Sequence, residues 1–187
     1  MLLGPDDDLG FIPQRILVNG ASGSGKTTLA TDLASQLHLP YTEIDGLYHG
    51  PGWVPRASFL DDVRRLADSP AWITDWQYSE ARPLLLARCE LIVWLDHPRF
   101  LVMRRATART LRRRFRREEL WNGNREGPLR HVFTDPEHIL RWAWSSYPRV
   151  AQRAAQVLRD RPGLPVVRLR DDAEIARWRS GLGRLET

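Results

Sequence analysis

Short apolar runs alternate with longer amphipathic stretches along this chain of 187 residues. The short runs hold β-branched, aromatic and other apolar residues and are followed by polar or turn-forming residues, which predicts strands at 15–19, 41–44, 71–74, 91–95 and 166–169. In the longer stretches apolar residues recur every three or four positions, which predicts helices at 25–38, 58–68, 79–88 and 99–117. Asp171 and Glu174 have capping-box spacing and predict a last helix that ends near Gly181.

Strands that alternate with helices are typical of a parallel sheet with helices on both faces. We therefore expect an α/β fold with a five-stranded parallel sheet. One segment, 116–135, interrupts the alternation because it is polar and contains Gly123, Gly127 and Pro128. It lies between two predicted helices, and we expect it to form a small arginine-rich lid.

Length and composition favour one compact domain. We expect this domain over residues 15–187, with an arginine helix and the lid at about 98–135, after a flexible leader over residues 1–14. The leader is acidic and lacks the basic and apolar regions of a secretory signal. The longest uninterrupted apolar run, 91–95, is too short to cross a membrane. Cys89 is the only cysteine, so no internal disulfide forms, and a cytoplasmic location is expected.

One stretch matches the phosphate-binding pattern G-x-x-x-x-G-K-[ST] without deviation. It follows a predicted strand and opens a predicted helix. Its glycines let the backbone turn successive N–H groups toward a phosphate, and the start of the helix adds its own free N–H groups. The expected nucleotide-binding residues are Gly20, Ala21, Ser22, Gly23, Ser24, Gly25, Lys26, Thr27 and Thr28.

Lys26 is the only lysine of the chain, and every other strong positive charge comes from arginine. In a phosphate-binding loop of this kind the lysine reaches the β- and γ-phosphates, and the hydroxyl group at the position of Thr27 coordinates Mg²⁺. The sequence therefore predicts ATP and Mg²⁺ as cofactors.

The order of motifs resembles the adenylate-kinase-like group of small P-loop kinases and, within it, the bacterial topology modulation proteins. The resemblance extends over roughly residues 15–182, although only the P-loop is a sharp motif. It implies the P-loop NTPase fold with five parallel strands, ATP and Mg²⁺ as cofactors, and phosphoryl transfer to a small acceptor, first of all a nucleoside or nucleotide. It is carried by Gly20 to Thr28, Ile44-Asp45-Gly46-Leu47-Tyr48, Gly52-Trp53, Trp72 to Asp75, Leu91 to Pro98 and Leu120 to Glu126.

Asp45 ends the second predicted strand, where ligands of parallel sheets gather. In similar kinases an acidic residue here faces the acceptor, where it would orient the attacking hydroxyl group or accept its proton. The alternative is an aspartate that caps a turn through Gly46. Tyr48, His49 and Trp53 follow in the same loop, and either stack on a planar acceptor or pack as ordinary side chains.

Asp75 ends the third predicted strand in a Walker-B arrangement, which predicts a water-mediated Mg²⁺ ligand. Asp96 is the alternative, since it follows the more hydrophobic strand. The families that this chain resembles take no metal ligand from that strand, and Asp96 is expected to cap the next helix. Those families have glycine after the position of Asp75, whereas this chain has Trp76, which we expect to reshape the acceptor pocket.

The predicted helix 99–117 carries two stripes. One stripe is apolar and is expected to pack against the domain, namely Leu101, Ala108, Leu111 and Phe115. The other lies about a quarter turn away and would line a cleft with guanidinium groups, those of Arg105, Arg109, Arg112 and Arg116.

Arg105 and Arg109 match the R-x-x-x-R of adenylate-kinase-like helices that precede the lid. The resemblance implies that the first stacks on the nucleotide base and the second binds phosphate, for which guanidinium is suited. Arg125 is a lid candidate that would reach the site on closure, and Arg141 is a further candidate. The alternative is that these arginines form a solvated face of an arginine-rich protein.

The net charge of +5 fits an anionic partner. A small-molecule kinase competes here with a nucleic-acid-associated P-loop protein and with a regulatory ATPase that has no acceptor. A cleft-facing arginine stripe and a second carboxylate at Asp45 favour the kinase. A nucleic-acid partner would need arginines on an open face and is therefore not expected, nor is a membrane partner. The sequence does not indicate an oligomeric state.

Overall fold

Six parallel strands form one sheet in the order β1-β6-β5-β2-β4-β3. A computed structural model describes residues 1–116, 119–124 and 139–182 of the chain. Central strand β2 lies between β4 and β5, and the strand order reverses direction there. In parallel sheets the carboxyl end of such a strand is the usual place for a ligand-binding crevice. The strands are β1 (Leu2–Leu3), β2 (Arg15–Gly20), β3 (Tyr41–Thr42), β4 (Trp72–Asp75), β5 (Leu91–Leu95) and β6 (Val166–Leu169).

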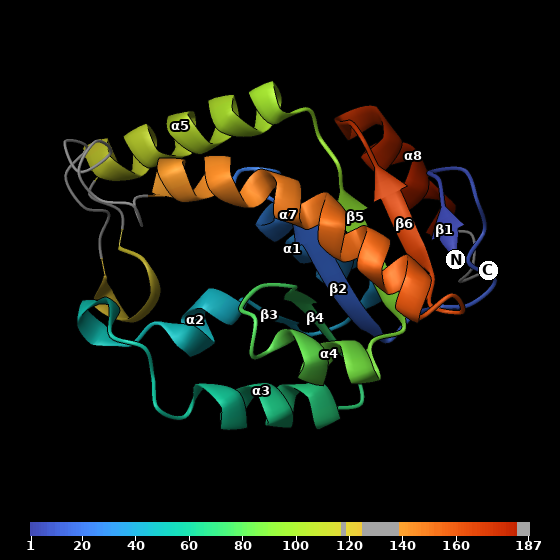
Figure 1. Ribbon diagram of the computed structural model, residues 1–187, viewed down its shortest axis with the longest axis horizontal. Helices are drawn as coiled ribbons and strands as arrows, with labels where there is room; N and C mark the ends of the chain where they lie inside the picture. The colour runs from blue at the N-terminus through green and yellow to red at the C-terminus, as the bar shows by residue number, and fades with distance from the viewer. Residues whose placement is uncertain (117–118, 125–138, 183–187) are drawn as a thin grey trace.

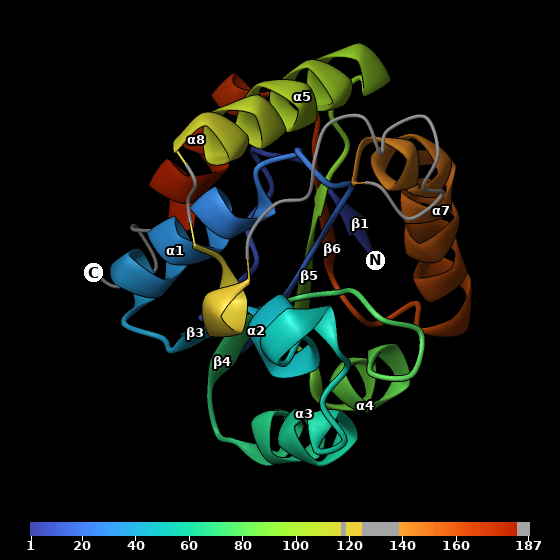
Figure 2. The same ribbon diagram turned by 90° about the vertical axis from the view of Figure 1, so that its left-hand side faces the viewer.

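Helices cover both faces of the sheet (Figures 1 and 2). One hydrophobic core forms beneath α3, α4 and α7, and a second forms beneath α1 and α8. Both faces of β2, β4 and β5 are therefore buried, as expected for a parallel sheet. The helices are α1 (Lys26–Leu37), α2 (Ile44–Tyr48), α3 (Phe59–Asp68), α4 (Arg82–Arg88), α5 (Arg99–Arg116), α7 (Ile139–Asp160) and α8 (Asp172–Leu182), with short 3₁₀ turns η1 (Pro51–Trp53) and η2 (Trp121–Gly123).

The predicted α/β fold is confirmed, but the predicted number of strands is wrong. Leu2 and Leu3 pair in parallel with Val166 and Val167 of β6, and Leu3 packs against the core beneath α1 and α8. Without this pairing, β6 would present an open edge. The beginning of the expected leader therefore belongs to the sheet as its sixth strand.

The predicted strand at 41–44 is also corrected. Strand β3 ends at Thr42, and α2 begins at Ile44, whose side chain is fully buried. The helical turn is closed by the backbone N–H of His49, which donates to the carbonyl of Asp45. The side chain of Ile44 anchors the start of α2 in the core beneath α3, α4 and α7, so Asp45 lies in the first turn of α2 and not at a strand end.

Part of the predicted lid, including Arg125, lies outside the residues that the structure describes. In the described part, α5 is followed by residues 119–124, which include η2. No helix in the described ranges is long and apolar enough to cross a membrane.

Candidate active site

The P-loop curls at the carboxyl end of β2. Gly23 and Gly25 have φ values of +92° and +95°, a conformation that favours glycine. The backbone N–H of Ser24 donates to the carbonyl of Ala21 (3.0 Å), which closes the curl. A side chain at Gly20 would meet the hydroxyl oxygen of Ser24 at 2.4 Å. The loop therefore has the concave backbone that phosphate binding requires, and Gly25 caps the start of α1.

Lys26 lies in the first turn of α1, and its side chain is buried. Its ammonium group donates to the carbonyl of Ala21 (3.3 Å). Burial lowers the pKa of Lys26, whereas the nearby carboxylates of Asp75 and Asp45 raise it. Thr27 and Thr28 are exposed in the same turn. The structure thus brings the predicted lysine, the predicted metal ligand and the predicted acceptor carboxylate together.

Asp75 is the most deeply buried of these carboxylates. Burial raises its pKa to about 7, while Lys26 acts in the opposite direction. The hydroxyl group of Tyr41 donates to its Oδ2 (3.5 Å), and its Oδ1 has no hydrogen-bond partner. An orphaned carboxylate oxygen beside a phosphate-binding loop fits a role toward a hydrated cation.

Glu43 is a site residue that the sequence analysis missed. Its Oε1 accepts a hydrogen bond from the hydroxyl group of Thr27 (3.4 Å), and its charge contributes to the raised pKa of Asp75. Within the described residues, no cluster of three His, Cys, Asp or Glu side chains forms a ready metal site. Oxygen donors from Thr27, Glu43 and Asp75 nevertheless fit Mg²⁺, which is usually held by one or two carboxylates, water and substrate phosphates.

The carboxylate of Asp45 contacts Tyr78, one of a group of aromatic side chains that also includes His49 and Tyr48. The hydroxyl group of Tyr78 donates to Oδ1 of Asp45 (2.5 Å) and lies 3.2 Å from Nε2 of His49. Tyr78 has a φ of +54°, which is unusual for this residue type, and its ring stacks on Tyr48 at 4.1 Å. Burial raises the pKa of Tyr78 and lowers that of His49. The phenol therefore remains a donor and holds the carboxylate of Asp45 in place.

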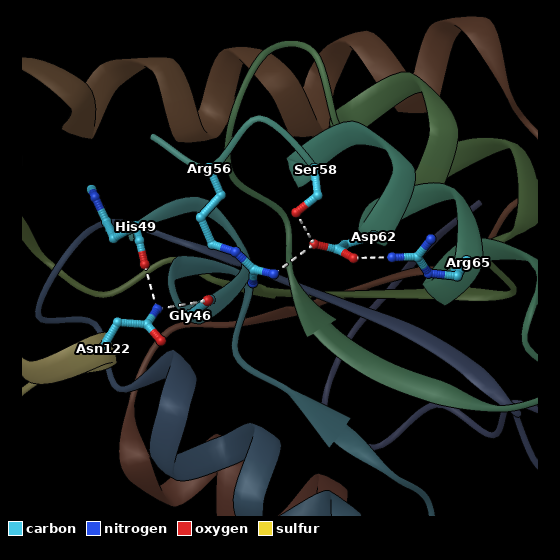
Figure 3. A network of polar contacts seen from close by, with 7 residues as sticks. All are labelled: Gly46, His49, Arg56, Ser58, Asp62, Arg65 and Asn122. Carbon is cyan, nitrogen blue, oxygen red and sulfur yellow. Dashed lines mark hydrogen bonds and ion pairs between the residues drawn. The ribbon is translucent and has the colours of Figure 1, made fainter. Parts of the chain in front are cut away.

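Residues 119–124 fold onto the loop that carries Asp45. The indole N–H of Trp121 donates to Oε2 of Glu43 (2.6 Å). The amide of Asn122 donates to the carbonyls of Gly46 (3.4 Å) and His49, as Figure 3 shows. The buried side chain of Asn124 accepts from the backbone of Trp53 and donates to the carbonyl of Gly50, both at 2.9 Å. We call residues 119–124 the clamp segment.

The loop held by the clamp segment leads into a second polar network (Figure 3). Oδ2 of Asp62 in α3 accepts from the hydroxyl group of Ser58 (2.9 Å) and pairs with Arg56 (3.2 Å), and its other oxygen pairs with Arg65. The hydrogen bond from Ser58 and the two arginines lower the pKa of Asp62. This network fixes the start of α3, so the loop that carries Asp45 is held both by the clamp segment and at the start of α3.

Helix α5 contacts the P-loop closely. Nη2 of Arg109 donates to the hydroxyl oxygen of Ser22 (2.8 Å), which places this predicted phosphate ligand at the phosphate loop. A side chain at Gly23 would lie 2.7 Å from the carbonyl oxygen of Val102. Arg105 instead forms an ion pair with Asp172 at the start of α8 (2.5 Å).

The predicted apolar stripe of α5 is wrong. Its buried face consists of Val102, Ala106 and Thr110, whereas Phe115 is 81% exposed. The buried residues still recur every four positions, but they lie on a different face of the helix from the predicted one. The small side chain of Ala106 on this face allows the P-loop to approach the helix closely. Arg105 and Arg109 are half-buried beside this face, whereas Arg112 and Arg116 are exposed.

Two other predictions concern residues after Asp75. Trp76 is buried in the core, and its indole N–H donates to the carbonyl of Arg82 (3.5 Å). Asp96, the alternative metal ligand, forms an ion pair with Arg168 of β6, so its carboxylate already has a partner. Arg125 and the side chain of Arg141 lie outside the described part of the structure.

Arg153 of α7 is a further site residue that was not predicted. Its Nη2 donates to Oδ1 of Asn19 (3.4 Å), the residue that precedes the P-loop. Its charge also acts on Lys26 and lowers the pKa of that lysine. Burial lowers the pKa of Arg153 itself to about 10. No spacing signal in the long helix pointed to it.

Comparison with solved structures now places the fold. A gluconokinase from Sinorhizobium meliloti 1021 is similar, with a TM-score of 0.52 and 20% identity over 92% of this chain and 93% of that chain. The two proteins share a fold. Weaker likenesses are to shikimate kinase from Aquifex aeolicus vf5 (TM-score 0.48, 14% identity, 92% of this chain and 96% of that one) and to shikimate kinase from Bacteroides thetaiotaomicron (0.47, 15%, 94% and 97%).

Sequence comparison adds no closer likeness. The chain matches no protein family description and no curated protein. The expected α/β fold is confirmed and is shared with the gluconokinase, while the likeness to topology modulation proteins stays a prediction.

A cavity of about 410 Å³ lies elsewhere, between the start of the chain and α8. Asp6, Asp7 and Asp8 contribute to its lining, and no P-loop residue does. Arg177 also lines it and pairs with Asp6, which leaves two aspartates of the lining without a counter-charge among the described residues. This net negative lining disfavours a triphosphate, so the candidate active site remains at the P-loop.

Proposed function

We propose that the protein is a magnesium-dependent small-molecule kinase that transfers the γ-phosphate of ATP to a hydroxyl group. The observation that carries this proposal is the convergence of Lys26, Asp75 and Asp45 at a curled P-loop. A phosphate-binding loop alone would also serve a regulatory ATPase. A second carboxylate, held by a tyrosine hydroxyl group on the acceptor side, supports transfer to an acceptor.

Each residue has a role that follows from its position. The backbone of the P-loop would bind the β-phosphate, and Lys26 and Arg109 would stabilise the charge that develops during transfer. Thr27, Asp75 and Glu43 would hold Mg²⁺, which neutralises phosphate charge when bound. Asp45 would orient the acceptor hydroxyl group and accept its proton, with Tyr78 keeping the carboxylate in place.

Two sources bear on the acceptor. The resemblance in sequence implies a nucleoside or nucleotide, whereas the similar solved structures are named as gluconokinase and shikimate kinase. A screen with ATP and Mg²⁺ against nucleosides, nucleotides and polyhydroxy acids, read by mass spectrometry of phosphorylated products, would identify the acceptor class.

Lys26→Met tests the proposal directly. The substitution keeps the length of the side chain and removes its charge, so ATP affinity and turnover should both fall, turnover by roughly a hundredfold or more. Titration calorimetry and a product assay would measure the two effects. A variant that binds and consumes ATP like the wild type would contradict the proposal. Arg159→Met, which alters an exposed arginine at the end of α7, serves as the control.

A further inference from the structure

Three arginines lie near one another beside the P-loop. Arg82 is the first residue of α4, and Arg149 and Arg153 lie one turn apart on α7. The two flanking arginines repel Arg153 strongly enough to contribute to its lowered pKa. Asn19, which accepts from Arg153, is fully buried, so this guanidinium group is fixed at the base of the P-loop.

Several half-buried arginines elsewhere in the fold are paired with a carboxylate. Arg15, Arg168 and Arg179 each form an ion pair with a carboxylate. Across the ranges that the structure describes, no carboxylate lies within ion-pair distance of Arg82, Arg149 or Arg153.

The cluster also has unsatisfied hydrogen-bonding capacity. Nε of Arg153 is buried and has no hydrogen-bond partner. Burial lowers the pKa of Arg82 as well as that of Arg153. Arg82 and Arg153 are half-buried, whereas Arg149 is exposed at the edge of the cluster. Half-buried like charges without a counter-charge are costly, and an anion from outside the chain would relieve that cost.

The position of the cluster indicates where such an anion would come from. The backbone N–H of Arg82 donates to the carbonyl of Tyr78 (3.1 Å), and Tyr78 holds Asp45 through its hydroxyl group. Arg153 lies close enough to Lys26 to affect its charge. Arg153 therefore lies near the lysine of the P-loop, and helix α4, which begins at Arg82, follows the residue that holds Asp45.

We propose that Arg82, Arg149 and Arg153 bind an anionic group of the acceptor, a carboxylate or a phosphate, while Asp45 engages its hydroxyl group. This inference rests on the proposed kinase function. It excludes neutral nucleosides and neutral sugars as preferred acceptors and selects hydroxy acids, sugar phosphates or nucleotides. Guanidinium groups match both anions because each offers paired N–H donors.

The first test uses simple anions as probes. The P-loop is filled with a non-hydrolysable ATP analogue and Mg²⁺, and potassium phosphate or potassium acetate is then titrated at constant ionic strength by calorimetry. Arg153→Met and Arg82→Met should each weaken anion binding roughly tenfold, because each removes charge-assisted hydrogen bonds. Arg159→Met should not. The anion that binds the wild type more tightly identifies the group as phosphate or carboxylate.

Two results would overturn the inference. Either the wild type binds neither anion, or Arg153→Met and Arg82→Met bind it as the wild type does. A loss of affinity for the ATP analogue in the same variants would also contradict it, because the arginines would then serve the nucleotide. Unchanged affinity for the analogue shows that the variants are folded.

A second test compares matched acceptors by thermal shift with the ATP analogue present. Gluconate is paired with glucitol, and ribose 5-phosphate with ribose. The charged member of one pair should raise the melting temperature of the wild type more than the neutral one, and Arg153→Met should abolish the difference. Equal effects within both pairs would refute an anionic acceptor. That result would leave the kinase proposal standing, because the kinase proposal is tested separately by the effect of Lys26→Met on ATP binding and turnover.

Discussion

At the scale of single residues, Asp75 links the site to the stability of the fold. Its pKa is raised by burial from 3.8 to about 7, so between these values the folded protein holds a proton that the unfolded chain has lost. The stabilising contribution is therefore complete below about pH 4 and is lost as the pH rises through about 7.

This difference predicts a pH dependence that Asp75→Asn removes. In the presence of a chelator, the melting temperature of the wild type should fall more between about pH 5 and pH 8 than that of the variant. Thermal denaturation followed by circular dichroism at several pH values would measure both slopes. Equal slopes would mean that the carboxyl group is not held protonated.

Tyr78 is predicted to act through Asp45. Tyr78→Phe retains the ring that stacks on Tyr48 but removes the hydroxyl group that binds the carboxylate. We expect turnover to fall roughly tenfold with little change in ATP affinity, because orientation of Asp45 is lost while the P-loop is intact. The control is Tyr147→Phe, whose hydroxyl group binds the carbonyl of His97. A fall in ATP affinity as large as the fall in turnover would make Tyr78 a structural residue.

Sequence alone predicted the residues that belong to a local pattern. The P-loop is contiguous, and Asp45 and Asp75 follow strand-like segments, so chain order suffices to find them. Glu43, Tyr78 and Arg153 could not be found in this way, because they come from separate elements and meet only when the sheet, α4 and α7 are assembled. The position of Glu43 two residues before Asp45 was the only available signal.

At the scale of elements, α5 couples the P-loop to the clamp segment. Periodicity predicted the helix nearly to its bounds but selected the wrong buried face. Hydrophobicity favoured the larger residue Phe115, whereas packing against the P-loop required the small side chain of Ala106. The close approach of the P-loop backbone to the α5 backbone arises only in the assembled fold, so the spacing of hydrophobic residues does not predict it.

Arg109 is predicted to be the functional arginine of α5. Arg109→Ala removes the guanidinium group at Ser22 and should lower turnover by roughly 10² to 10³. Arg104→Ala alters an exposed arginine of the same helix and should have little effect. Steady-state kinetics and circular dichroism of both variants would separate catalysis from folding. Equal turnover in the two variants would assign Arg109 to the solvated face.

At the scale of the whole molecule, the α/β architecture followed from the alternation of elements. Strand β5 has the predicted bounds because it is a buried, continuous apolar run, and β6 has them because three of its four residues are apolar and buried. Strand β1 was missed because two residues are too few for a periodic pattern, and its pairing depends on β6, more than 160 residues away. Strand β3 was predicted too long because the apolar residue Ile44 is buried as the first residue of α2 and not as part of the strand.

Deletion of residues 2–4 should destabilise the fold without affecting the site. It removes β1 and opens the edge of β6, for which a loss of about 1–2 kcal/mol is expected. In a protein of this size that corresponds to a fall in melting temperature of roughly 2–8 °C. Calorimetry would measure the fall, and ATP affinity should stay within about twofold of the wild type. Unchanged stability would show that the edge pairing contributes nothing.

Trp121 of the clamp segment donates to Glu43, two residues before Asp45, and the guanidinium group of Arg113 in α5 lies over its ring. The same helix binds the P-loop through Arg109. If a nucleotide at the P-loop displaces α5, these contacts would transmit the displacement to the loop that carries Asp45. Binding of the nucleotide and of the acceptor would then be coupled, and each would change the dissociation constant of the other by the same factor, whichever binds first.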